Sequence, residues 1–239
     1  MIKVKVFSDC HGYLPNIDEP FDLLLIAGDI TPCFWGYSGR TVQWEWLTNE
    51  FKEWLDKLPY KTISSKVFIT PGNHDKVFEA ITVSEIMELK NILGHRFELL
   101  INEEKKFTYK DSNGDVKDLR IFGTPYCKIF GNWSFMFHDE FLAEAYSQIP
   151  EGLDILITHD PPALNGLGVI TQGRQNGKNA GNEILAERVL EVKPKYVFSG
   201  HIHSGNHTLE EYEGIMMANV SHVDEMYDPV YPVLTFDFE

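Results

Sequence analysis

The chain has 239 residues, of which 43% are hydrophobic and 24% are charged, and its formal net charge is −15. This length suits one α/β domain with a full hydrophobic core, and the composition excludes disordered, fibrous and membrane-embedded chains. The negative charge repels polyanions over long range, so a protein that coats duplex nucleic acid is not expected.

The apolar stretches are too short to cross a membrane. The longest, Phe21–Ala27, is far below the roughly 20 residues of a spanning helix. The first seven residues alternate like a strand and lack the apolar block of a secretory signal. Three cysteines, Cys10, Cys33 and Cys127, are an odd number without CxxC spacing, which argues against a disulfide framework and a zinc knuckle. We therefore expect a cytoplasmic chain with reduced thiols and no membrane partner.

Taken in chain order, apolar or β-branched runs alternate with helical patterns. The runs that predict strands are Ile2–Phe7, Leu23–Ala27, Lys66–Thr70, Leu119–Phe122, Ile155–Thr158 and Tyr196–Phe198. The apolar stripes that predict helices are Val42–Leu58, Thr82–Leu93, Glu140–Gln148 and Asn182–Val192. This alternation is typical of α/β architecture.

Two further regions predict β-hairpins. Asn113-Gly114 lies in a polar stretch between Phe107–Tyr109 and the next predicted strand. Asn-Gly is a common sequence in the turns of β-hairpins. Near the C-terminus, Ile215–Val220 and Val233–Phe238 again alternate, and we expect them to pair with each other.

No internal repeat, low-complexity tract or long polar linker divides the chain. We therefore expect a single domain over residues 1–239. Two mixed β-sheets packed face to face, with helices on the outside, would accommodate all the predicted elements.

Five polar clusters stand out, and most follow a predicted strand directly. They are Asp9-Cys10-His11, Gly28-Asp29, Gly72-Asn73-His74-Asp75, Thr158-His159 and Gly200-His201-Ile202-His203. Ligands of open α/β sheets bind at the loops beyond the carboxyl ends of the strands. The five clusters are therefore predicted to converge on one crevice.

The residue types in these clusters suit metal coordination. In an extended segment, Asp9 and His11 would point to the same side and face one ion together. His201 and His203 form a second such pair, although a turn there would direct them to different ions. Carboxylate mixed with imidazole suits Mn²⁺, Fe or Zn²⁺ better than Mg²⁺ or Ca²⁺. Seven protein donors would leave open positions for water and substrate on two ions.

Each cluster alone has an ordinary structural explanation as a turn, a helix cap or a strand end. All five in one chain, mostly at strand ends, are hard to attribute to turns and caps. The remaining histidines fit no such pattern and are expected at the surface, while Cys10 is expected to be buried rather than reactive. These histidines are His95, His138, His207 and His222.

The clusters resemble the signature of the calcineurin-like metallophosphoesterase superfamily, which is D-x-H, G-D, G-N-H-D/E, H and G-H-x-H in that order. The resemblance covers nearly the whole chain and is closest to the metallophosphoesterase-domain-containing, class III phosphodiesterase-like branch. It implies a four-layer αββα sandwich. The segments that favour this branch are Gly28–Thr31, Thr124–Tyr126, Thr158–Pro162, Asn219–Ser221 and Pro232–Phe238.

By matching position, the resemblance also implies a role for each site residue. One divalent cation would be held by Asp9, His11 and His203, and the other by Asn73, His159 and His201. Asp29 would bridge the two ions, and turnover would depend on it. His74 would be the catalytic histidine rather than a ligand.

The chain departs from one branch of this superfamily. Protein Ser/Thr phosphatases continue the G-D block with a further Asp-Arg-Gly, whereas here Gly28-Asp29 runs into Ile30-Thr31-Pro32. A protein phosphatase is therefore not expected. The missing Asp usually orients the catalytic histidine, so the partner of His74 is open, and neighbouring Asp75 is not automatically placed to replace it.

These features together predict a phosphoesterase that hydrolyses a small phosphodiester, such as a cyclic nucleotide, by attack of a metal-bridging hydroxide. Loops 31–40 and 163–181 are expected to select the substrate. One alternative is a nuclease acting on nucleic-acid ends, but Lys105-Lys106 is too short for a basic track. A second alternative is a non-catalytic scaffold, which would be expected to lose ligands, and none is lost here.

Overall fold

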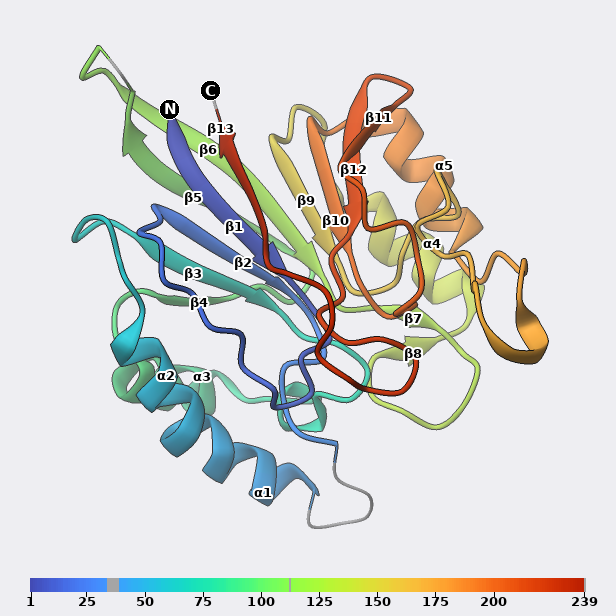
Figure 1. Ribbon diagram of the computed structural model, residues 1–239, viewed down its shortest axis with the longest axis horizontal. Coiled ribbons are helices and arrows are strands. Elements are labelled where there is room, and N and C mark those ends of the chain that lie inside the picture. Colours follow the sequence, from blue (N-terminus) through green and yellow to red (C-terminus); the bar gives the residue numbers. More distant parts are fainter. Residues whose placement is uncertain (34–38, 112, 239) are drawn as a thin grey trace.

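Two large β-sheets lie face to face, with helices on their outer faces, in the computed structural model of the chain (Figure 1). The structure describes residues 1–33, 39–111 and 113–238. A small third sheet is formed by β7 (Cys127–Lys128) and β8 (Met136–Phe137).

The first sheet has five strands in the order β13-β1-β2-β3-β4. Strands β1 to β4 are parallel to one another, and β13 is antiparallel to β1 at the edge. The strands are β1 (Ile2–Phe7), β2 (Leu23–Ala27), β3 (Lys66–Thr70), β4 (Phe97–Leu99) and β13 (Leu234–Phe238).

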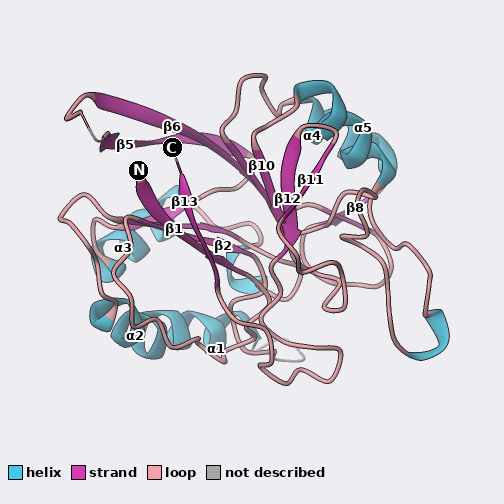
Figure 2. Ribbon diagram, turned by 45° about the horizontal axis from the view of Figure 1, so that its top comes forward, coloured by secondary structure: helices cyan, strands magenta, loops and turns pink. Residues whose placement is uncertain are grey.

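The second sheet has six strands in the order β11-β12-β10-β9-β6-β5 (Figure 2). Its four central strands are parallel, and an antiparallel strand lies at each edge. The strands are β5 (Glu103–Lys110), β6 (Val116–Thr124), β9 (Ile155–Thr158), β10 (Tyr196–Ser199), β11 (Glu210–Tyr212) and β12 (Ile215–Asn219).

Helices cover the outer face of each sheet. The first sheet is covered by α1 (Gly39–Trp46), the π-helical turn η1 (Leu47–Phe51), α2 (Lys52–Lys57) and α3 (Val83–Leu93). The second is covered by α4 (Asp139–Ser147) and α5 (Glu183–Val192), and two 3₁₀ turns are η2 (Lys76–Phe78) and η3 (Gly173–Gln175). Local caps set two helix starts: Thr82 and Glu85 form a capping box on α3, and Asn182 accepts from the Leu185 amide of α5.

Strand β2 shows why the molecule has four layers. All five of its residues are buried, because apolar side chains point to both faces of the sheet. Leu23 and Leu25 pack between the two sheets, whereas Leu24 and Ile26 pack against the helices. Burying each such side chain contributes about 1.5–3 kcal/mol. The predicted αββα sandwich of two mixed sheets is confirmed.

The predicted C-terminal hairpin is wrong. The segment from Ile215 forms β12, which pairs with β10 and β11 in the second sheet. The segment ending at Phe238 forms β13, which pairs with β1 in the first sheet. Alternation identifies a strand and its buried face but not its partner, and the intervening residues pass from one sheet to the other. The hairpin around Asn113-Gly114 is confirmed by β5 and β6.

Candidate metal centre

Strands of both sheets deliver their polar clusters to one region. Asp9 and His11 follow β1, Asp29 follows β2, and Asn73 follows β3, all in the first sheet. His159 follows β9, and His201 and His203 follow β10 in the second sheet. The structure brings the side chains of these seven residues together, so the predicted convergence of the strand ends is confirmed.

A first group consists of Asp9, His11 and His203, all buried, with ligand atoms within 4.8 Å of one another. The Nε2 atoms of His11 and His203 are 3.4 Å apart. Nε2 of His203 lies 3.5 Å from Oδ1 of Asp9. Two imidazole nitrogens and a carboxylate oxygen therefore face a common point.

A second group lies beside the first and shares Asp29 with it. Oδ2 of Asp29 is 3.4 Å from Nε2 of His159 and 3.8 Å from Nε2 of His11. Nε2 of His159 is also 2.9 Å from Oδ1 of Asn73. The ring of His201 lies 4.9 Å from that of His159. One carboxylate oxygen thus lies between the two groups.

Backbone carbonyls orient two of the imidazoles. Nδ1 of His159 lies 3.1 Å from the Ala27 carbonyl oxygen, and Nδ1 of His203 lies 2.9 Å from that of Asp224. A carbonyl only accepts, so each Nδ1–H donates, and Nε2 is the atom of each ring that would bind a cation.

The site backbone is turned rather than extended, which corrects the predicted basis for pairing Asp9 with His11. Both residues have left-handed φ values, 48° and 44°, and Asp29 and His201 follow with 51° and 67°. Such conformations cost about 1–3 kcal/mol each and gather at functional sites. A turn also separates His201 from His203, since the Ile202 amide donates to the Gly200 carbonyl. The two histidines accordingly face different groups.

Glycines allow the loops to approach the carboxylates closely. A Cβ atom on Gly200 would lie 2.0 Å from Oδ2 of Asp9, and one on Gly72 would lie 2.2 Å from Oδ1 of Asp29. No larger residue fits either position without displacing a predicted ligand.

The charge and hydrogen bonding of the site fit two cations. Asp9 and Asp29 are 0% and 2% exposed. Among the residues that the structure describes, no lysine or arginine side chain forms an ion pair with either carboxylate. Nδ2 of the buried Asn73 also has no hydrogen-bond partner. Buried carboxylates require positive charge nearby, and dications among these oxygen and nitrogen donors would supply it.

The four ligand imidazoles differ in protonation. Burial lowers the pKa of His11 to about 4 and the pKa of His201 to about 3, which favours the neutral ligand form. Burial also acts to lower the pKa of His159 and His203, but the Asp29 carboxylate raises that of His159 to about 10 and the hydrogen bond with Asp9 raises that of His203. A cation bound there would take the place of the proton on these two rings. Burial alone would raise the pKa of Asp9, but its hydrogen bond with His203 and the charge of His159 lower that pKa to about 2. The carboxylate therefore stays ionised.

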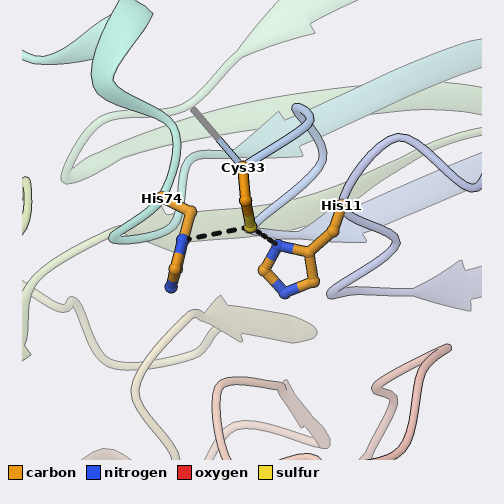
Figure 3. Close-up of side chains that lie close together, drawn as sticks. All are labelled: His11, Cys33 and His74. Carbon is orange, nitrogen blue, oxygen red and sulfur yellow. Dashed lines mark hydrogen bonds between the residues drawn. The ribbon is translucent and has the colours of Figure 1, made fainter. Parts of the chain in front are cut away.

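His74 lies beside the two groups and is fixed at three places. Its backbone amide donates to Oδ1 of Asp29 over 2.7 Å. Its ring lies 4.2 Å from the ring of Trp133. Its Nδ1 lies 3.3 Å from Sγ of Cys33, which is also 3.1 Å from Nδ1 of His11 (Figure 3).

The sequence profile of the calcineurin-like phosphoesterases matches residues 2–205. The chain belongs to this family. Its members hydrolyse phosphoesters and generally bind two divalent metal ions, which the clusters of candidate ligands in this chain are suited to hold.

Similar proteins support the same branch of the family. Metallophosphoesterase domain-containing protein 1 of Homo sapiens is 29% identical over 96% of this chain and 69% of its own length. The UPF0046 protein C25E10.12 of Caenorhabditis elegans is 31% identical over 92% of this chain and 75% of its own length.

Solved structures share the fold at low sequence identity. The phosphopantetheinyl hydrolase of Mycobacterium tuberculosis has a TM-score of 0.52 and 16% identity, covering 94% of this chain and 90% of that one. The protein TT1561 of Thermus thermophilus has a TM-score of 0.51 and 10% identity, covering 99% and 98%. Within the described part of this phosphoesterase, no helix combines the length and apolar character needed to cross a bilayer.

Several residues near the centre have no site role predicted from the sequence. The sequence predicts Cys33 only as a reduced thiol and indicates no role for Trp133. The rings of Phe130 and Tyr227 lie 5.2 Å from His201 and 4.8 Å from His11. No motif marks these residues. Of the loop 31–40 expected to select the substrate, residues 34–38 lie outside the described residues.

The histidines outside the clusters behave in two ways. His95 and His138 are exposed, as predicted. His207 and His222 are half-buried instead, which corrects the prediction for these two. Nε2 of His207 bonds to the His203 carbonyl, and Nδ1 of His222 bonds to the Tyr231 carbonyl. Both histidines fasten loops beside the centre.

Proposed function

We propose that the chain is a dinuclear metal-dependent hydrolase of a small phosphodiester. Each cation would contact residues of both sheets, and Asp29 would contact both cations. One ion is assigned to Asp9, His11 and His203, and the other to Asn73, His159 and His201.

The observation that carries this proposal is the position of Asp29. Its Oδ2 atom lies 3.4 Å from Nε2 of His159 and 3.8 Å from Nε2 of His11. A buried carboxylate between two groups of imidazoles matches the position that would bridge a two-metal site, in which the ions lie about 3.5–4 Å apart.

Two bound cations would lower the pKa of a bound water towards about 7 and neutralise charge on the phosphoryl oxygens. His74 would supply the other half of the reaction. With Nδ1 engaged by Cys33, its Nε2 lies on the side away from the sulfur (Figure 3). From there a protonated ring could donate to the leaving oxygen.

The charges around the centre favour a diester. A phosphomonoester carries a charge of about −1.5 to −2 at pH 7, because its second pKa is near 6, whereas a diester carries one negative charge. Among the described residues, no lysine or arginine side chain bonds to the seven ligands to balance a second charge.

Aromatic side chains beside the centre are suited to the second esterifying group of a diester. Phe130 is 62% exposed beside His201, and Tyr227 is 40% exposed beside His11. An exposed ring next to a metal site offers an apolar face to a flat or apolar group such as a nucleoside base.

The donor set and the cysteines support two further assignments. Imidazole mixed with carboxylate favours Mn²⁺, Fe or Zn²⁺. Cys10, Cys33 and Cys127 are all free thiols, which fits a cytoplasmic location.

The proposal is tested by metal analysis of the purified protein, followed by rates on a bis-aryl diester, an aryl monoester and cyclic nucleotides. We expect two transition-metal ions per chain and the highest kcat/KM on a diester. A preference for the monoester would overturn the diester assignment. Two bound ions without turnover on any phosphoester would favour a binding scaffold.

Replacing Asp29 by Asn gives the sharpest variant. Asp29→Asn should reduce turnover to near the detection limit and lower the metal content, because an amide is a poor bridging ligand. Asp56→Asn removes the same charge from an exposed position on α2, where Asp56 pairs with Lys52, and serves as the control. Unchanged metal content and rate in Asp29→Asn would refute the bridging role.

A further inference from the structure

Cys33 lies in the loop after the G-D block, where phosphatases with an Asp-Arg-Gly motif carry a further Asp that this chain lacks. The sequence there runs Gly28-Asp29-Ile30-Thr31-Pro32-Cys33. Sγ of Cys33 lies 3.3 Å from Nδ1 of His74 and 3.1 Å from Nδ1 of His11 (Figure 3). The thiol therefore lies between the proposed acid and a proposed metal ligand.

We propose that Cys33 is the positioning residue of His74, holding its ring so that Nε2 faces the leaving group. This inference rests on the proposed function, since it assigns a task to Cys33 within that reaction. In this proposal Cys33 acts on the reaction only through His74 and does not contact the substrate.

The loops that carry the two residues are fixed to each other by Gln43 of α1. Its buried amide nitrogen donates to the carbonyls of Pro32, at 3.2 Å, and His74, at 2.7 Å. Its amide oxygen accepts from the backbone of Val77 at 3.0 Å. Gln43 thus holds the backbone of His74 and of Pro32, the residue before Cys33.

Asp75 fixes the same two loops from the other side. Its carboxylate accepts from the backbone amides of Thr31 at 2.9 Å and Gly72 at 2.8 Å, and from the Thr31 hydroxyl at 2.8 Å. With its oxygens engaged there, Asp75 holds backbone and does not bond to the His74 ring. The partner of the His74 ring is therefore Cys33 and not Asp75, which follows His74 in the sequence.

The protons in this arrangement balance. A His74 ring that acts as acid carries hydrogens on both nitrogens, so Nδ1–H donates to a sulfur lone pair. His11, if it binds a cation through Nε2, also keeps its hydrogen on Nδ1 and donates to the same sulfur. During the reaction the Nε2–H bond of His74 breaks, an O–H bond forms on the leaving oxygen, and Nδ1–H stays on the ring.

The kinetic test compares Cys33→Ala with Cys33→Asp across a series of diesters whose leaving groups differ in pKa. We expect Cys33→Ala to keep both metals and lose about 10–100-fold on poor leaving groups, part of the about 10²–10⁴ of an acid, with little loss on activated ones. Cys33→Asp restores an acceptor and should recover most of the rate. Removing Cys33 from a His74→Ala protein should have no further effect.

The matched control is Thr31→Ala, which loosens the same loop by removing the hydroxyl bonded to Asp75. It should lower the melting temperature and change all rates by one factor, whatever the leaving group. The same uniform loss in Cys33→Ala, or loss of metal from it, would overturn the proposal and make Cys33 a support of His11.

A second readout needs no turnover. In zinc-loaded protein at a pH where His74 is neutral, nitrogen-15 NMR of the ring should show the Nδ1–H tautomer in wild type and a shift towards Nε2–H in Cys33→Ala. An unchanged His74 spectrum would refute the proposal. If wild type hydrolyses no phosphoester but the tautomer shifts, the proposed function fails while the contact stands.

Discussion

At the scale of single residues, three different contacts hold His74: one at its backbone amide, one at its ring and one at its Nδ1 atom. The Asp29 carboxylate accepts from its amide, Trp133 lies against its ring, and Cys33 lies at its Nδ1. These restraints leave Nε2 to face the reaction. A side chain held in this way needs no large rearrangement to deliver a proton, which is how preorganised groups contribute to catalysis.

His74→Ala should keep both metals but lose about 10²–10⁴-fold on substrates with poor leaving groups, because these need protonation as the bond breaks. Rates on activated aryl diesters should fall much less. A plot of log kcat/KM against leaving-group pKa should therefore be steeper for the variant than for wild type. Parallel lines for the two proteins would count against the acid role.

At the scale of elements, the loops after β2 and β3 act as one unit. Asp75 accepts hydrogen bonds from the backbone of Ile30, Thr31 and Gly72, and Gln43 of α1 bonds to both loops. Buried backbone amides need acceptors, and here one carboxylate serves three of them. The helix and the carboxylate together set the distance between Asp29 and Asn73.

Asp75→Asn should destabilise the protein by about 2–3 kcal/mol, because the amide nitrogen that replaces one carboxylate oxygen cannot accept and would leave the buried donors on that side unpaired. For a chain of this size that lowers the melting temperature by about 4–12 °C. Chemical denaturation measures the free energy of unfolding, and Asp118→Asn, on an exposed part of β6, is the control. A loss no larger than that of the control would contradict this account.

At the scale of the whole molecule, the proposed ions join the two sheets. Asp9, Asp29 and Asn73 come from the first sheet, while His159 and His203 come from the second. Each ion would therefore stabilise the packing between the sheets as well as its own site. A ligand that binds only the folded state stabilises it by mass action.

Removing both metals should lower the melting temperature by about 11–22 °C relative to protein with free metal at 100 times the Kd of each site. This value follows from about 2.7 kcal/mol of linkage for each of the two ions and about 2–4 °C per kcal/mol at this chain length. Calorimetry of chelated and reloaded protein measures the shift, and Asp29→Asn should respond much less. Equal melting temperatures before and after reloading would mean that the ions do not link the sheets.

Local chemistry was enough to predict most strands and helices and the polar clusters of the site, while the family resemblance selected the candidate ligands among them. The strand from Leu23 to Ala27 is recognisable because its run is apolar on both faces, and the predicted helix from Thr82 to Leu93 because its apolar residues form a stripe. Polar clusters after such strands converge because parallel strands end at one edge. The residues from Asp9 to His203 were therefore identifiable before any coordinates.

Only the tertiary structure decided which distant segments meet. It assigned β13 to β1 rather than to β12, and it brought Cys33 within 3.3 Å of His74, 41 residues away in sequence. Neither contact leaves a periodic signal, because each depends on how whole loops and sheets pack. Short-range preferences fix what a segment becomes, while the burial of its faces against the rest of the chain fixes what it touches.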